Sequence, residues 1–163
     1  MTSAWGTLLF VRALSYRVKI VNLQLNNMPD LTKSKFKMQL DYNDKINEFG
    51  DNIVRLYDFD RSQAEKFRQL VKQTIIIDKN QLDLSTVDFI EERNCNLILR
   101  ISDEDLGIIR YGREKFVCDL TIEGYEHLIS LLDPFCKKET KGYQWLYDID
   151  SQTDFLFSPG GTW

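Results

Sequence analysis

Two repeating patterns of apolar side chains restrict what this chain can fold into. Between Lys35 and Tyr42 polar and apolar side chains alternate, and a period of two residues is typical of a half-buried β-strand. Over residues 61–76 and 122–133 apolar side chains recur every three or four positions, which is typical of an amphipathic helix. Such faces must be buried against one another, so the sequence predicts an α+β fold.

Capping signals define the ends of the two predicted helices. Asp60 followed by Gln63 has the spacing of a capping box, which predicts that the first helix starts there. A polar break shortly after Ile76 predicts its end. The second helix is predicted to begin after Thr121, a favourable N-cap, and to end at Pro134, which cannot donate a helical hydrogen bond.

The other apolar segments predict strands that form a sheet. These strands are expected at residues 53–57, 82–90, 95–101, 105–110, 115–120 and 154–157. Because Gly112 lies in the short connection 111–114, the two segments around it are predicted to pair as a hairpin. We therefore expect residues 35–163 to form one two-layer domain, with a mostly antiparallel sheet of about five to seven strands and two helices packed on one face.

Residues 1–34 form a basic N-terminal segment that differs from the rest. Its first 27 residues contain no acidic side chain, so the segment is interpreted either as an over-extended gene start or as an added strand. The alternative start residues are Met1, Met28 and Met38. Residues 16–25 alternate in two opposite phases, which favours a strand with a bulge. Both alternatives remain open.

The composition and the net charge indicate what class of partner the protein binds. With 163 residues, of which 43% are hydrophobic and 28% charged, the chain can bury the core of one globular domain. Its net charge is −4, and residues 39–163 alone carry −9. An acidic body repels phosphate backbones and attracts basic protein surfaces, so a protein partner with a basic surface is expected and nucleic acid is not. No pattern indicates an oligomeric state.

The number of cysteines and the length of the apolar runs indicate the cellular compartment of the protein. Three cysteines are an odd number in a chain long enough to fold without disulfides, which is typical of reduced thiols in the cytoplasm. No apolar run approaches the ~20 residues needed to cross a bilayer, so the sequence predicts no membrane span.

The sequence contains few side chains suited to catalysis. The cysteines Cys95, Cys118 and Cys136 could act as nucleophiles only beside a base, and His127 is the one histidine. On a helical wheel His127 lies opposite the apolar face, so it is expected to be exposed while the cysteines are buried. We predict no catalytic residue and no cofactor.

Neighbouring carboxylates raise the question of a metal site. Asp103, Glu104 and Asp105 are the best of several weak candidates, because carboxylate oxygens bind hard cations such as Mg²⁺. The simpler interpretation is a polar hairpin turn, so we assign no metal. A small carboxylate-based, metal-dependent enzyme or ligand-binding domain is the alternative function.

The C-terminal segment is rich in aromatic side chains and is the main candidate for partner binding. Its members are Tyr143, Trp145, Tyr147, Phe157 and Trp163. Such side chains are enriched at binding hot spots, but they also complete hydrophobic cores. The sequence leaves both alternatives open.

No motif resembles a known family. The absence of a catalytic group, the acidic body and the aromatic tail together favour a small acidic cytosolic protein that acts as a protein-interaction or regulatory module without catalytic activity. An immunity- or antitoxin-like partner or an accessory subunit is the expected kind of role.

Overall fold

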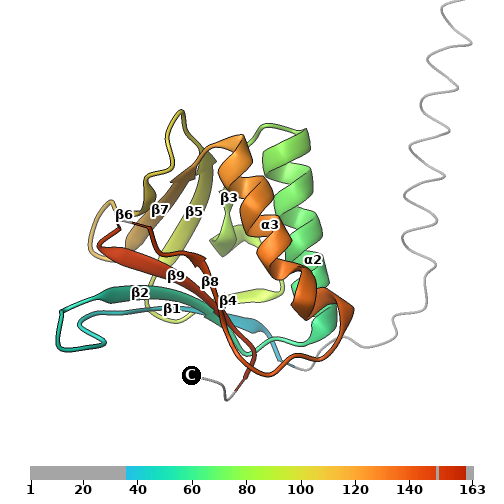
Figure 1. Cartoon of the computed structure of the whole chain (residues 1–163), viewed down its shortest axis with the longest axis horizontal. Helices are drawn as coiled ribbons and strands as arrows, with labels where there is room; N and C mark the ends of the chain where they lie inside the picture. The colour runs from blue at the N-terminus through green and yellow to red at the C-terminus, as the bar shows by residue number, and fades with distance from the viewer. Residues whose placement is uncertain (1–35, 150, 161–163) are drawn as a thin grey trace, which may run out of the picture. The chain divides into compact units, whose positions relative to one another are not determined.

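The computed structural model describes residues 36–149 and 151–160, which form an α+β domain with two mixed sheets and two α-helices (Figure 1). In chain order the elements are β1 (Met38–Asn43), β2 (Asn52–Tyr57), α2 (Arg61–Val71), the π-helical turn η1 (Lys72–Ile77), β3 (Leu82–Asp83), the 3₁₀ turn η2 (Leu84–Thr86), β4 (Ile90–Glu92), β5 (Asn96–Ile101), β6 (Gly107–Arg110), β7 (Lys115–Leu120), α3 (Ile122–Lys137), β8 (Gln144–Tyr147) and β9 (Thr153–Ser158). The predictions for residues 1–34 and for Trp163 lie outside the described residues.

Each sheet combines parallel and antiparallel pairs. The five-stranded sheet has the order β4-β1-β2-β9-β8, with parallel pairing of β1 with β4 and of β2 with β9. The four-stranded sheet has the order β3-β5-β7-β6, with parallel pairing of β5 with β7. The C-terminal strand β9 therefore lies inside a sheet, between β2 and β8.

The α+β class is confirmed, but the prediction of a single, mostly antiparallel sheet is wrong. Apolar alternation shows which side chains share a face and contains no information on which strands are neighbours. The predicted strand at 82–90 is also divided. Asp83 accepts hydrogen bonds from the backbone nitrogen and hydroxyl of Ser85, at 3.0 and 2.6 Å, and the resulting turn separates β3 from β4, which belong to different sheets.

The predicted helix starts are confirmed. Asp60 accepts a hydrogen bond from the Gln63 backbone nitrogen, and the Gln63 side chain accepts one from the Asp60 backbone nitrogen, which completes the capping box. Thr121 caps α3. The predicted end at Pro134 is wrong, because α3 continues to Lys137. Phe135, just beyond the proline, is buried in the core, and this burial favours one further helical turn.

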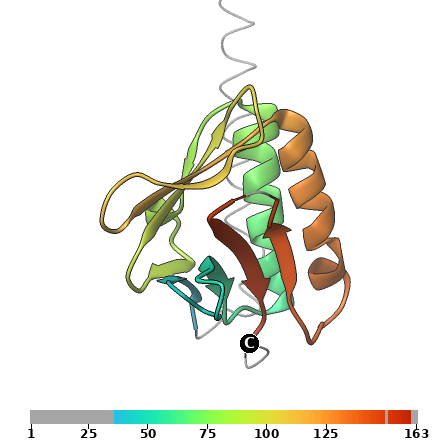
Figure 2. The same ribbon diagram turned by 60° about the vertical axis from the view of Figure 1, so that its left-hand side comes forward.

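One hydrophobic core joins both sheets to both helices. Figures 1 and 2 show α2 and α3 side by side, and apolar side chains from both pack into the same cluster as the sheets. Phe157 of β9 lies at the centre of an aromatic group in this core. Its ring stacks on Phe59 at 3.9 Å between centroids and also contacts Phe67 and Phe135. No helix in the described segments has the length and apolar character that a membrane span requires.

Replacing the central core ring should destabilise the whole domain. Phe157 is 0% exposed, so Phe157→Ala leaves a cavity and should lower the free energy of unfolding by about 3–5 kcal/mol. Phe49→Ala is the matched control, because Phe49 is 81% exposed and its loss should change stability by less than about 0.5 kcal/mol. Urea unfolding followed by circular dichroism measures both. Equal effects of the two substitutions would contradict the central role of Phe157.

Candidate functional site

A pocket of about 420 Å³ lies between α3 and the C-terminal strand β8. We call it the α3–β8 pocket. Glu123, Gly124, His127 and Leu131 form its helix side, and residues 144–149 and Asp105 complete it. It therefore brings together members of two groups that the sequence singled out separately, the carboxylate Asp105 and the aromatic residues Trp145 and Tyr147.

Helix geometry explains the first side of the pocket. Glu123, His127 and Leu131 are spaced four residues apart, so their side chains follow one another along one face of α3. The expectation that His127 is exposed is confirmed. The helical pattern contains no information on β8, which runs past this face of α3. Because β8 lies there, the exposed helix surface becomes one wall of a pocket.

Asp105 connects three parts of the chain at this site. Its carboxylate accepts a hydrogen bond of 2.6 Å from the Thr121 backbone nitrogen, at the start of α3. Its backbone carbonyl accepts a hydrogen bond of 2.9 Å from the hydroxyl of Tyr147. The carboxylate also fills the space that a Cβ at Gly124 would occupy. Asp105 thus fixes the start of α3 relative to the aromatic wall.

A close approach at Gly107 holds the Tyr147 ring in place. Gly107 has φ of +69°, a conformation that other residues adopt only with strain. A Cβ at this position would overlap the ring of Tyr147. The start of β6 therefore forms a flat support for the ring that lines the pocket.

Adding one methyl group at this support should destabilise the domain. Gly107→Ala introduces both backbone strain and a steric clash, so we expect a loss of about 2 kcal/mol or more in the free energy of unfolding. Gly112→Ala is the control, since no atom lies within 4 Å of its Cβ position and its φ is outside the left-handed region. Thermal and urea unfolding should show a near-neutral control. A neutral Gly107→Ala would mean that the Tyr147 ring moves freely.

Among the described residues, the charged side chains that line the pocket are all carboxylates. Three carboxylates line it, from Asp105, Glu123 and Asp148, and the described lining contains no lysine or arginine. Glu123 and Asp148 make no hydrogen bond or ion pair with the described residues. The negative charge extends onto β9, where burial and then the charges of Asp148 and Asp51 raise the pKa of Asp154. These properties favour a cationic ligand.

The structure divides the aromatic tail between core and surface. Phe157 is fully buried and unavailable to a partner. Trp145 and Tyr147 are half-buried and line the pocket. Tyr143 is 48% exposed and packs edge-to-face against Trp145, with ring centroids 5.8 Å apart. Of these three aromatic side chains, Trp145 and Tyr147 are therefore accessible to a ligand in the pocket and Phe157 is not.

The other candidate groups are placed less favourably for chemistry. Asp103, Glu104 and Asp105 are exposed, and only Asp105 lines the pocket. Over residues 36–149 and 151–160, no three His, Cys, Asp or Glu side chains are grouped so that they could hold a metal ion. Since the Asp105 carboxylate is already bonded to the Thr121 nitrogen, the geometry gives no support to the metal-dependent alternative.

The three thiols lie in environments that keep them protonated. Burial is the main cause that raises the pKa of Cys95, Cys118 and Cys136 to about 12 each. The thiolate is the reactive form of cysteine, so these groups are weak nucleophiles at neutral pH.

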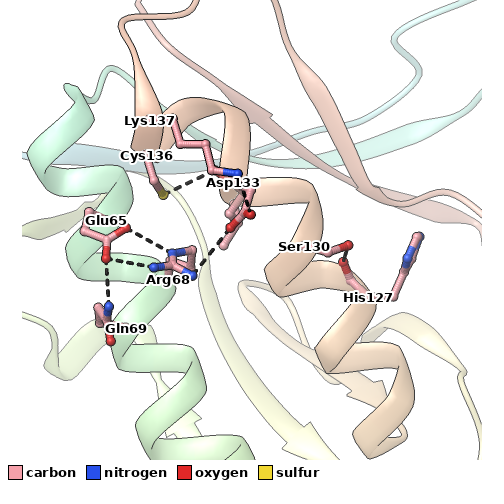
Figure 3. A network of polar contacts seen from close by, with 9 residues as sticks. Glu65, Arg68, Gln69, His127, Ser130, Asp133, Cys136 and Lys137 are labelled. Carbon is pink, nitrogen blue, oxygen red and sulfur yellow. Dashed lines mark hydrogen bonds and ion pairs between the residues drawn. The ribbon is translucent and has the colours of Figure 1, made fainter.

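A polar cluster between α2 and α3 is separate from the pocket (Figure 3). Arg68 donates two hydrogen bonds to Glu65, at 3.0 and 2.9 Å, and one to Asp133, at 3.4 Å. Lys137 also pairs with Asp133, at 3.1 Å. Figure 3 shows His127 projecting from the other side of α3, away from this cluster. The cluster therefore joins the helices and leaves the pocket face free.

The same cluster should make stability depend on pH in acid. Hydrogen bonds from Arg68 and then from Gln69 lower the pKa of Glu65 from 4.5 to about 2. A carboxylate with a lowered folded-state pKa stabilises the fold above pH ~4.5, and this contribution is lost as the pH falls towards 2. Because the side chain is 38% exposed, Glu65→Gln should cost at most about 1 kcal/mol at pH 6.

Urea unfolding at pH 6 and pH 3 measures this effect. The difference between the wild type and Glu65→Gln should be smaller at pH 3. Glu126→Gln on α3 is the control, because Glu126 is exposed and makes no hydrogen bond or ion pair with the described residues. An equal loss at both pH values would show that the Glu65 charge does not contribute.

The pocket combines aromatic rings, exposed apolar side chains and uncompensated carboxylates. This combination suits a side chain that has an apolar stem and a positively charged end. Comparison with family models, with curated proteins and with solved structures finds no match.

Proposed function

We propose that this protein is a small interaction or regulatory module that binds a basic segment of a partner protein in the α3–β8 pocket. The observation that carries the proposal is the pocket lining, in which the described residues supply three carboxylates and no cation. An immunity- or antitoxin-like role, or that of an accessory subunit, agrees with binding that needs no chemical step. We expect it to act in the cytoplasm, because its three cysteines are free thiols.

The rings and carboxylates give complementary contacts to an arginine or lysine. The half-buried rings of Trp145 and Tyr147 can contact the apolar stem or the face of a guanidinium, and a cation–π contact contributes about 0.5–2 kcal/mol. Glu123 and Asp148 can accept charge-assisted hydrogen bonds from its end, which are stronger than neutral ones. A volume of about 420 Å³ is sufficient for one such side chain.

Apolar side chains at the pocket add contact area for the partner backbone or its next residue. Leu131 lines the helix side, and Ile149 is 64% exposed at the other side. An exposed isoleucine beside aromatic rings is typical of a binding surface, because the partner removes it from water. The net charge of −4 would in addition steer a basic partner towards the domain.

A nona-arginine peptide provides a defined probe of this surface. Titration into the ¹⁵N-labelled full chain at pH 7.5, followed by NMR, should shift the resonances of His127, Tyr147, Ile149 and the Trp145 indole most strongly. Glu123→Lys should weaken binding roughly fivefold to tenfold, because it replaces a favourable charge contact by a repulsive one.

Glu126→Lys is the matched control for this substitution. It makes the same charge change on the same helix, but Glu126 does not line the pocket, so the affinity should fall less than about twofold. A nona-glutamate peptide should not bind. Resonance shifts spread evenly over the acidic surface, or equal effects of the two substitutions, would refute the proposal.

A further inference from the structure

We infer that the α3–β8 pocket is a pH-regulated site, in which protonation of His127 weakens the binding of the partner's basic side chain. This inference rests on the proposed function of the pocket. His127 is the one histidine in the chain, and its side chain lines the same cavity as the three carboxylates. Imidazole is the side chain that ordinarily gains a proton between pH 8 and pH 5, and here it lines a pocket that is proposed to hold a cation.

The position of His127 on α3 makes it a competitor for the partner. It follows Glu123 by four residues, and an acidic residue followed by a cation at this spacing is the favourable orientation for a helical ion pair. A protonated His127 can therefore pair with Glu123 and remove one acceptor from the partner. Its charge also repels an arginine or lysine bound a few ångströms away.

The other ionisable groups of the pocket lining reinforce this effect. Glu123 lies on the same helix, Asp105 lies on the loop before β6, and Tyr147 and Asp148 lie at the end of β8. Among the described residues, His127 makes one hydrogen bond outside the helical backbone, in which its backbone carbonyl accepts from the Ser130 hydroxyl at 2.6 Å (Figure 3). The pocket lining that includes His127 thus contains three carboxylates and, among the described residues, no lysine or arginine.

Few other groups change charge in the same interval. Carboxyl groups ordinarily titrate below pH 5, and arginine stays charged. The thiol pKa values of about 12 keep all three cysteines neutral. Asp154 and Glu92 are the described carboxyl groups with a raised pKa, and a variant that removes only the histidine separates their contribution.

The experiment measures binding of nona-arginine to the full chain at pH 7.5 and pH 5.5, at one ionic strength, by fluorescence anisotropy. The peptide carries a dye whose charge and emission do not change between these pH values. The charge of the peptide is constant over this interval. The wild-type Kd should be roughly threefold to tenfold higher at pH 5.5, as expected for one added charge near the ligand. NMR shifts recorded at both pH values confirm that the peptide occupies the same pocket.

Two variants test whether His127 is the cause. His127→Gln is neutral at both pH values, so its Kd should be equal at pH 7.5 and pH 5.5. His127→Lys carries a fixed charge, so its Kd should also be independent of pH and should exceed that of His127→Gln. Because His127 is exposed, both variants should fold.

The outcomes separate this inference from the proposed function. If the peptide shifts the pocket resonances and the wild-type Kd is the same at both pH values, the pH regulation is wrong and the binding site stands. If His127→Gln keeps the pH dependence of the wild type, another group is responsible and the inference is again wrong. If the peptide does not perturb the pocket at either pH, the proposed function itself fails.

Discussion

The structure depends on the burial of β9 on both of its faces. Phe155, Leu156 and Phe157 are each 0% exposed, although neighbouring side chains of a strand point to opposite sides of the sheet. Phe157 packs against aromatic rings from α2 and α3, while hydrogen bonds join β9 to β2 and β8. The strand therefore fixes β8 beside α3, and without it the pocket would have no second wall.

The pocket is built from groups that also hold the fold together. The Tyr147 ring rests on Gly107 and its hydroxyl bonds to Asp105, so its position is set before any ligand arrives. Asp105 at the same time satisfies the backbone nitrogen of Thr121. Such a preorganised wall lowers the entropy lost on binding. In contrast, Glu123 and Ile149 are exposed and contribute little to the core, so they are the positions where function and stability can be separated.

Features fixed by residues close in sequence were predicted, and those fixed by distant residues were not. The capping box of Asp60 and Gln63 spans four residues, and a helical wheel placed His127 on the exposed face of α3. The parallel pairing of β2 with β9 joins segments about 100 residues apart, and apolar alternation carries no signal for it. For the same reason the sequence identified Asp105, Trp145 and Tyr147 as separate candidates but did not bring them to one pocket.

The distribution of ion pairs explains why the pocket should attract a cation from outside. Within the sheets, two buried carboxylates are bonded to arginines of neighbouring strands. These pairs are Asp41 with Arg55, at 2.7 Å, and Asp119 with Arg100, at 2.6 Å. Glu123 and Asp148 have no such partner among the described residues, and crowded like charges raise the free energy of the folded state. A basic side chain bound in the pocket would relieve this repulsion, and a protonated His127 would relieve part of it from within. The same electrostatic imbalance would therefore drive both the proposed binding and its proposed regulation.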